Sequence, residues 1–102
     1  MRIISKPRLQ SFGDAHSQAK TPLEDWLYIA KNAEWKNIDD VRKIYQNADP
    51  VQVKSGKTVT VFNIGGNKYR LITAIHYNAQ KVFIFALMTH AEYSKNLWKN
   101  NY

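Results

Sequence analysis

The densest hydrophobic patterning lies between Thr58 and Tyr93. Three runs rich in β-branched and aromatic residues are separated there by Gly65-Gly66 and by Asn78-Ala79-Gln80. Runs of this kind, bounded by turn-forming residues, predict a three-stranded antiparallel meander. Val82 to Met88 is apolar at every position, which predicts a strand that is central and covered on both faces, or paired with an N-terminal strand.

Helical spacing of apolar residues dominates the first half of the chain. After a short β-prone start at residues 2–5, a brief helix is predicted from about residue 7 to 15. The segment Thr21-Pro22-Leu23-Glu24 predicts a second helix that begins with a capping box. Asn37, followed by two acidic residues, predicts the start of a third. Residues 51–57 have no such pattern and predict a loop.

These elements predict a single α+β domain spanning residues 1–102. Its N-terminal helices pack on an antiparallel sheet, in the order β-α-α-(α)-β-β-β. The length allows one hydrophobic core, and no internal repeat is present.

The two turns decide which side chains share a face of the sheet. If Gly65-Gly66 is a two-residue hairpin turn, Asn63 lies opposite Lys68. If residues 78–80 form a three-residue loop, Lys68 lies opposite His90 and Arg70 lies opposite Met88. Asn63, Lys68 and His90 would then form a polar row, with Arg70 on the same face and Glu92 and Tyr93 just beyond the strand. A slip of one residue in the second loop would send His90 to the other face.

Charge is distributed unevenly along the chain. The formal net charge is +7, and residues 51–102 contribute seven Lys or Arg against one acid, Glu92. A basic, aromatic-rich half indicates a polyanionic partner, although a positive surface also serves solubility alone. Lys54 and Lys57 in the predicted loop are candidates for contact with a phosphate backbone, with simple solvation as the alternative.

Several classes of function are disfavoured. The chain contains no cysteine, which excludes disulfides, thiolate nucleophiles and thiolate metal sites. For the same reason, His90-Ala91-Glu92 cannot complete a zinc deaminase signature. The three histidines lack ligand-like spacing, so no metal or other cofactor is expected. The longest apolar run is too short to cross a membrane, and no secretory signal is evident, so the cytoplasm is the expected location.

Two segments resemble a known family. The run Asn63-Ile64-Gly65-Gly66-Asn67-Lys68-Tyr69-Arg70-Leu71 and the run Met88-Thr89-His90-Ala91-Glu92-Tyr93, with Ala33-Glu34-Trp35-Lys36 before the third helix, are similar to the HigB family of RelE-like toxins. The resemblance implies a small toxin that cuts messenger RNA, usually on the translating ribosome. It also implies a cognate HigA-like antitoxin with a helix-turn-helix domain, and contact with operator DNA only through the toxin-antitoxin complex.

The resemblance also implies site residues. Arg70 occupies the arginine of the family's G-N-x-x-R pattern, and Thr89, His90, Glu92 and Tyr93 form its T-H-x-E-Y ending. One departure is Phe85, because many relatives have arginine there. Lys68 or Lys95 would have to replace that arginine, or the activity would be weaker.

A mechanism follows as a hypothesis. His90, with Lys68 as its rival, would remove the proton from an RNA 2′-hydroxyl, while Arg70, with Lys68 or Tyr93, would stabilise the phosphoryl charge. The products would be a 2′,3′-cyclic phosphate and a 5′-hydroxyl, without a metal ion. The remaining candidate RNA contacts are Asn63, Asn67, Lys54, Lys57, Glu92 and Lys95.

Other interpretations of the same residues stay open. Arg70 and Glu92 could form a structural salt bridge, and Tyr93 could serve only the core. The protein could bind RNA or DNA without cutting it, or be a degenerate toxin that acts as a co-repressor.

Overall fold

The computed structural model describes residues 1–102 as a five-stranded sheet with helical elements on both faces. The sheet order is β1-β5-β4-β3-β2. Its strands are β1 (Arg2–Ile4), β2 (Asp49–Gln52), β3 (Thr58–Ile64), β4 (Tyr69–His76) and β5 (Lys81–Thr89). Strand β1 runs parallel to β5, and the other neighbours are antiparallel. This confirms the α+β prediction and the pairing of the apolar last strand with an N-terminal strand.

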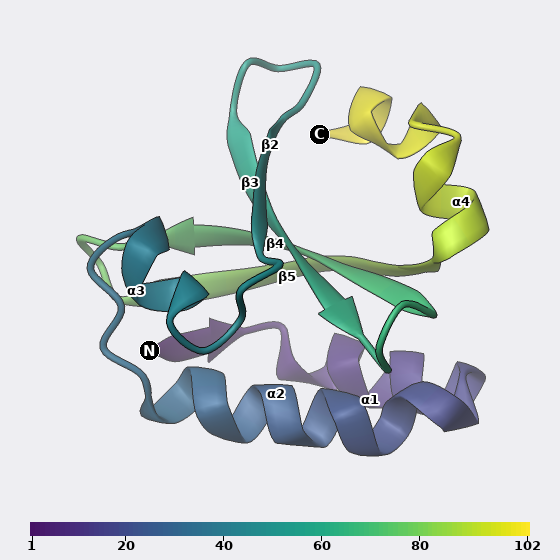
Figure 1. Cartoon of the computed structure of the whole chain (residues 1–102), viewed down its shortest axis with the longest axis horizontal. Coiled ribbons are helices and arrows are strands. Elements are labelled where there is room, and N and C mark those ends of the chain that lie inside the picture. Colours follow the sequence, from purple (N-terminus) through teal and green to yellow (C-terminus); the bar gives the residue numbers. More distant parts are fainter.

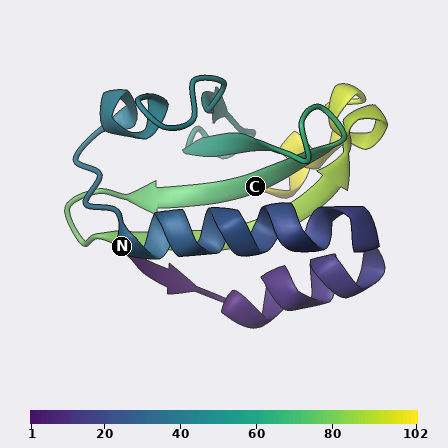
Figure 2. The ribbon, with the colours of Figure 1, turned by 60° about the horizontal axis from the view of Figure 1, so that its bottom comes forward.

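Helices cover one face, and the chain's last segment covers the other. The helical elements are α1 (Lys6–Ala15), the 3₁₀ turn η1 (Ser17–Ala19), α2 (Lys20–Asn32), α3 (Ile38–Arg42), α4 (His90–Ser94) and the 3₁₀ turn η2 (Leu97–Asn101). Helices α1 and α2 lie under the sheet, whereas α4, η2 and the tip of the β2–β3 hairpin lie on its other side (Figure 1). Figure 2 shows α1 and α2 side by side beneath the strands. No helix combines the length and the hydropathy that a membrane crossing requires.

The apolar side chains divide into two cores, one on each face. The first core joins the sheet to α1, α2 and α3, and includes Leu9, Leu23, Trp26, Val41, Phe62 and Leu71. The second core lies beneath the C-terminal segment and includes Val53, Val59, Val61, Ile72, Met88 and Trp98. Strand β5 contributes Val82 and Ile84 to the first core and Met88 to the second. An apolar strand with cores on both sides explains the unbroken hydrophobic run.

Strand β2 corrects the prediction of a loop over residues 51–57 at Val51 and Gln52, whereas residues 53–57 do form the loop between β2 and β3. Asp49–Gln52 pairs with Thr58–Val61 as the outer strand of a hairpin. Pro50 lies within this strand opposite Thr60, and proline is accommodated there because β2 is at the edge of the sheet. The proline conceals the strand in the sequence.

The helix starts agree with the sequence only in part. Asn37 caps α3 as expected, because its side-chain oxygen accepts a hydrogen bond from the Asp40 backbone N–H at 3.0 Å. The capping box predicted at Thr21 is wrong. Helix α2 begins at Lys20, directly after η1, and no side chain caps it. The preceding 3₁₀ turn has already set the direction of the chain.

Candidate active site

The pairing of β3 with β4 places Asn63 directly opposite Arg70. The turn between these strands holds four residues, Gly65 to Lys68, and closes at the pair Ile64 and Tyr69. Both glycines have positive φ, near 65° and 68°, a backbone conformation that side-chain-bearing residues rarely adopt. The predicted two-residue turn is therefore wrong, because Asn63 lies opposite Arg70 and not opposite Lys68. Asn63 and Arg70 still share a face, because the error preserves the alternation of side chains.

The pairing of β4 with β5 brings His90 to the same end of the sheet. Arg70 lies opposite Met88, and the His90 backbone N–H donates to the Lys68 carbonyl at 3.0 Å. Both pairs agree with the predicted register, although the predicted three-residue loop is wrong. The loop has four residues, closed by His76 and Lys81, and a β-bulge between Ile72 and Thr73 restores the register. The bulge leaves Phe85 as an extra residue in β5, so two irregularities compensate each other.

Arg70 is the centre of the site. Its side chain lies on the face of the second core, and only 8% of the residue is exposed. Nη1 donates to the carbonyls of Asn67 and Tyr69, both at 3.2 Å. Nη2 donates to Oδ1 of Asn67 at 2.8 Å and contacts Nδ1 of His90 at 3.1 Å. Every one of these acceptors is electrically neutral.

The guanidinium has no acidic partner. The chain's single ion pair joins Lys43 to Asp40, so the predicted alternative of a salt bridge between Arg70 and Glu92 is not present. A buried charge without a counter-ion is costly in free energy, so an anion that reached this guanidinium would be bound favourably. Arg70 is therefore placed to bind an anion.

The contact with Arg70 fixes the protonation pattern of His90. A guanidinium can only donate hydrogen bonds, so Nδ1 of His90 must be the acceptor. The ring is then the neutral tautomer that carries its proton on Nε2.

Tyr93 completes an aromatic wall beside the guanidinium. Its ring lies 5.7 Å from the Arg70 guanidinium carbon and stacks on Trp98, with 5.2 Å between ring centroids. The Trp98 indole N–H donates to the Tyr93 carbonyl at 3.2 Å. Partial burial raises the pKa of Tyr93, and the negative charge of Asp49 adds to that effect, while Arg70 opposes it. Tyr93 is therefore a neutral phenol at physiological pH and can donate a hydrogen bond.

Glu92 serves the local structure of α4. Thr89 is the N-cap, and its hydroxyl accepts from the Glu92 backbone N–H at 3.2 Å. The Glu92 carboxylate accepts in turn from the backbone N–H and the hydroxyl of Thr89, at 3.1 and 3.0 Å. These hydrogen bonds lower the pKa of Glu92. The reciprocal bonds form a capping box, which sets the start of the helix that carries His90 and Tyr93.

The lysines are spread around the site. We call Arg70, Asn67, His90 and Tyr93 the Arg70 cluster. The Lys68 ammonium donates to the side-chain oxygen of Gln18 in η1 at 3.0 Å, so it is engaged outside this cluster. Lys54 and Lys57 lie near the tip of the β2–β3 hairpin, and Lys95 follows α4; all three are exposed. The Lys54 backbone N–H donates to the Lys99 carbonyl at 3.1 Å, which ties the hairpin to η2.

Phe85 lies at the bulge. Its ring stacks on Tyr102 with 4.8 Å between centroids and 4° between planes. Arg8 stabilises the main chain at the bulge, because its Nη1 donates to the carbonyls of Ile84 and Phe85, both at 3.2 Å. Phe85 supplies no charge to the site.

Two residues near the site are absent from the sequence-based set. Asp49 pairs with Val61 in the ladder and so shares the face of Arg70, and its charge acts on Tyr93. Its position depends on β2, the strand that the sequence conceals. Trp98 lies in a C-terminal segment without a regular pattern, yet it is buried against Tyr93.

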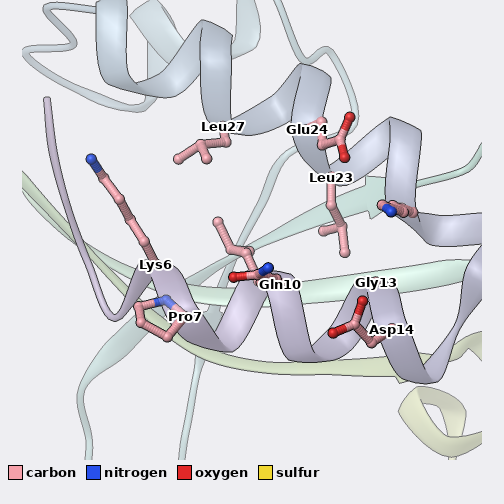
Figure 3. Close-up of a pocket in the computed structure, with 10 residues that line it drawn as sticks. Lys6, Pro7, Gln10, Gly13, Asp14, Leu23, Glu24 and Leu27 are labelled. Atoms are coloured by element: carbon pink, nitrogen blue, oxygen red, sulfur yellow. The ribbon is translucent and has the colours of Figure 1, made fainter.

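A separate groove lies on the other side of the sheet, between α1 and α2. It has a volume of about 490 Å³ and a lining of mixed charge. Figure 3 shows Leu23, Glu24 and Leu27 from α2 facing Lys6, Gln10 and Asp14 from α1. None of the Arg70 cluster lines this groove. No group of three or more His, Asp or Glu residues is arranged to share a metal ion.

Comparison with known proteins identifies relatives over most of the chain. Residues 19–96 match the profile of a family described as HigB_toxin, the RelE-like toxic component of a toxin-antitoxin system. The mRNA interferase toxin HigB of Escherichia coli K12 is 27% identical over 93 residues, which cover 91% of this chain and 88% of the relative. The mRNA interferase HigB of Shigella flexneri gives the same values. The mRNA interferase HigB of Escherichia coli O6:H1 strain CFT073 is 24% identical over 95 residues, with coverage of 93% and 90%.

Proposed function

This chain belongs to the HigB family of RelE-like toxins, and from that premise and the geometry around Arg70 we propose that it is an endoribonuclease that cuts messenger RNA. One observation supports this most strongly: a nearly buried guanidinium, without a carboxylate partner, contacts a histidine. An RNA phosphate is the anion that such a site would receive, and the 2′-hydroxyl beside it is the nucleophile.

Substrate binding itself activates the base in this proposal. The phosphate draws Nη2 of Arg70 away from His90, because a charged acceptor forms a stronger hydrogen bond than an imidazole nitrogen. Nδ1 of His90 is then free to take the proton of the 2′-hydroxyl, whose oxygen attacks the adjacent phosphorus. The bond from phosphorus to the 5′-oxygen of the next nucleotide breaks, and that oxygen takes a proton from solvent water. The products are a 2′,3′-cyclic phosphate and a 5′-hydroxyl, without a metal ion.

The other site residues support the charge that builds up on the phosphoryl oxygens. Arg70 and the Tyr93 phenol donate hydrogen bonds to these oxygens. Lys95, or Lys68 once it leaves Gln18, supplies the positive charge that Phe85 lacks. Asn63 and Asn67 contact the RNA beside Arg70. Lys54 and Lys57 bind the RNA phosphate backbone at a distance from the cleavage site. Glu92 contributes by stabilising α4.

The biological setting follows the family. The protein acts in the cytoplasm on messengers carried by translating ribosomes, and it arrests growth when it is free. A HigA-like antitoxin with a helix-turn-helix domain neutralises it. The toxin reaches operator DNA only as part of this toxin-antitoxin complex.

Arg70→Ala tests the proposal. The purified protein is added to a cell-free translation reaction, and the 5′-hydroxyl ends formed on the messenger are mapped by primer extension. Arg70→Ala is expected to lower the cleavage rate about a hundredfold or more, because the variant has no principal donor to the phosphoryl group. Arg2→Ala is the matched control, since Arg2 is exposed on β1 at the edge of the sheet. Arg70→Lys separates the effect of charge from that of folding, and thermal unfolding is recorded for every variant. Full cleavage by a folded Arg70→Ala protein would refute the mechanism.

A second candidate is favoured by Phe85, where many relatives have arginine. On that interpretation the chain has no remaining nuclease activity and acts as a co-repressor with the antitoxin. Intact messenger in the same reaction, together with operator binding by the complex, would support this candidate over the enzyme.

A further inference from the structure

A pocket lies on the face of the sheet that carries Arg70, at the other end of β4. It has a volume of about 410 Å³, within the range of ligand-binding pockets. Its walls come from the β2–β3 hairpin, the end of β4, the bulge of β5 and the C-terminal segment. We name it the aromatic pocket, and its lining includes Lys57, Val59, Ala74, His76, Phe85 and Tyr102.

Two stacked rings form a flat wall of the aromatic pocket. The rings of Phe85 and Tyr102 have 4.8 Å between their centroids and 4° between their planes, and neither residue is fully buried. The C-terminal segment is held against the hairpin, because the Lys54 backbone N–H donates to the Lys99 carbonyl at 3.1 Å (Figure 1). A flat, partly exposed aromatic surface suits a planar ligand such as a nucleobase.

The charge around the aromatic pocket suits an anionic strand. Lys57 lines it, whereas no aspartate or glutamate does. The flanking segments, residues 53–59 and 94–102, contain no acidic residue, and none of their lysines forms an ion pair; these are Lys54, Lys57, Lys95 and Lys99. Proteins bind single-stranded nucleic acid with basic groups on the phosphates and aromatic rings on the bases. An apolar protein segment would use the rings and leave the lysines unpaired.

The aromatic pocket lies on the path of a strand that passes Arg70. Ala74 and His76 follow Arg70 by four and six residues along β4, and side chains at this spacing share a face. The separation along the strand is about 13 to 20 Å. A base in the pocket therefore belongs to a nucleotide that does not adjoin the cleaved bond.

We propose that the aromatic pocket is a stacking subsite, which holds one base of the RNA strand at a distance from the cut, with Lys57 on a neighbouring phosphate. The inference rests on the proposed function, because that function identifies the strand as RNA. Every base has a flat face, so the subsite adds affinity and positions the strand without selecting a base. It assigns RNA binding to Phe85 and Tyr102, neither of which belongs to the Arg70 cluster.

Binding of an RNA that cannot be cut tests the inference. The probe is an oligoadenylate with a 2′-O-methyl group on every sugar, which therefore has no 2′-hydroxyl nucleophile. A second oligonucleotide has the same length and charge but abasic sugars. The wild-type protein is expected to prefer the strand with bases, and Phe85→Leu and Tyr102→Leu should each lower that preference about tenfold, because leucine is apolar but has no stacking face.

Two further variants separate stacking from charge. Tyr28→Leu is the matched control, because Tyr28 is an exposed tyrosine on α2, on the other side of the sheet, and its loss should not alter the preference. Lys57→Ala should weaken the binding of both strands equally, as expected for a contact with phosphate.

The outcomes distinguish the subsite from the nuclease, because cleavage is measured separately in the cell-free translation reaction. A wild-type protein that binds bases through Phe85 and Tyr102 but does not cut would refute the nuclease and leave the subsite in place. An unchanged preference in both leucine variants, or an equal loss of affinity for the two strands, would overturn the subsite even if the messenger is cut. Thermal unfolding is recorded for each variant, and Tyr102→Leu decides alone if Phe85→Leu does not fold.

Discussion

Arg70 donates four hydrogen bonds within the protein, yet none of its acceptors is charged. Asn67 holds one side of the guanidinium through its carbonyl and its side-chain oxygen, and His90 contacts the other. The side chain is therefore fixed in place before any ligand arrives, which lowers the entropic cost of binding. The contact with His90 is the one that an incoming phosphate can replace, because imidazole is not tied to Arg70 by the main chain.

Tyr93→Phe is expected to lower the rate of messenger cleavage by roughly tenfold to a hundredfold, because a donor to the phosphoryl oxygens is removed. The ring stays, so the stacking on Trp98 and the stability should persist. Because the pKa of Tyr93 is raised above its ordinary value of 10.0, the phenol keeps its proton throughout the neutral range. The ratio of wild-type to variant rates should therefore be constant between about pH 6 and 9. A ratio that changes sharply in this range would assign Tyr93 a different role.

At the scale of elements, the short helix α4 positions two of the proposed catalytic side chains. His90 is its first residue and Tyr93 lies one turn later. A helix of five residues has little stability of its own, so the capping box formed by Thr89 and Glu92 determines where it begins. Thr89, the N-cap, is also the last residue of β5. The pairing of β5 with β4 therefore determines where the His90 side chain lies.

Thr89→Ala is expected to lower the free energy of unfolding by about 1 kcal/mol, because the N-cap hydroxyl is removed. The folded-state pKa of Glu92 is below its ordinary value of 4.5, so its carboxylate stabilises the fold above that pH. This contribution disappears as the pH falls through the folded-state pKa. The deficit of the variant should therefore be greatest above pH 4.5 and shrink in more acidic solution, as measured by urea unfolding. Thr58→Ala, at an exposed threonine on β3, is the control. An equal decrease in its free energy of unfolding would show that the N-cap position of Thr89 is not the cause.

How far the sequence predicts this fold depends on the element. Periodicity is sufficient for α1, α2 and the three-stranded meander, because each buries a regular stripe. Strand β2 is hidden by Pro50, whose tolerance at a sheet edge is a tertiary property. The proximity of Arg70 and His90 is predicted correctly, but with a turn that the structure corrects. Turn length and bulges depend on packing, so local residue preferences do not specify them.

At the scale of the whole molecule, four lysines lie on the side of the sheet away from α1 and α2. The β2–β3 hairpin, with Lys54 and Lys57, and the C-terminal segment, with Lys95 and Lys99, both lie opposite α1 and α2 (Figure 1). Arg70 lies on this same face. A single RNA strand that crosses this face would meet basic side chains on both sides of the proposed cleavage site.

The affinity for single-stranded RNA is expected to fall steeply with salt, measured with the Arg70→Ala protein, in which cleavage is expected to be slow. Lys54→Ala and Lys57→Ala should each reduce the slope of log K against log salt concentration by about 0.7 for each phosphate that the lysine neutralises. Lys31→Ala, which removes an exposed lysine from α2, should leave the slope unchanged. Equal effects of all three changes would indicate non-specific attraction by net charge alone.

Phe85, the extra residue of β5 at the bulge, determines where this strand can lose a residue. Deleting Phe85 would let Ile84 and Ala86 continue an unbroken ladder opposite Thr73 and Ile72, with His90 still beside Arg70. Deleting any residue between Ala86 and Thr89 would instead rotate everything downstream to the wrong side. Position 85 is thus the place in this strand where the loss of one residue leaves Arg70 and His90 side by side, so chains one residue shorter there can keep that pair.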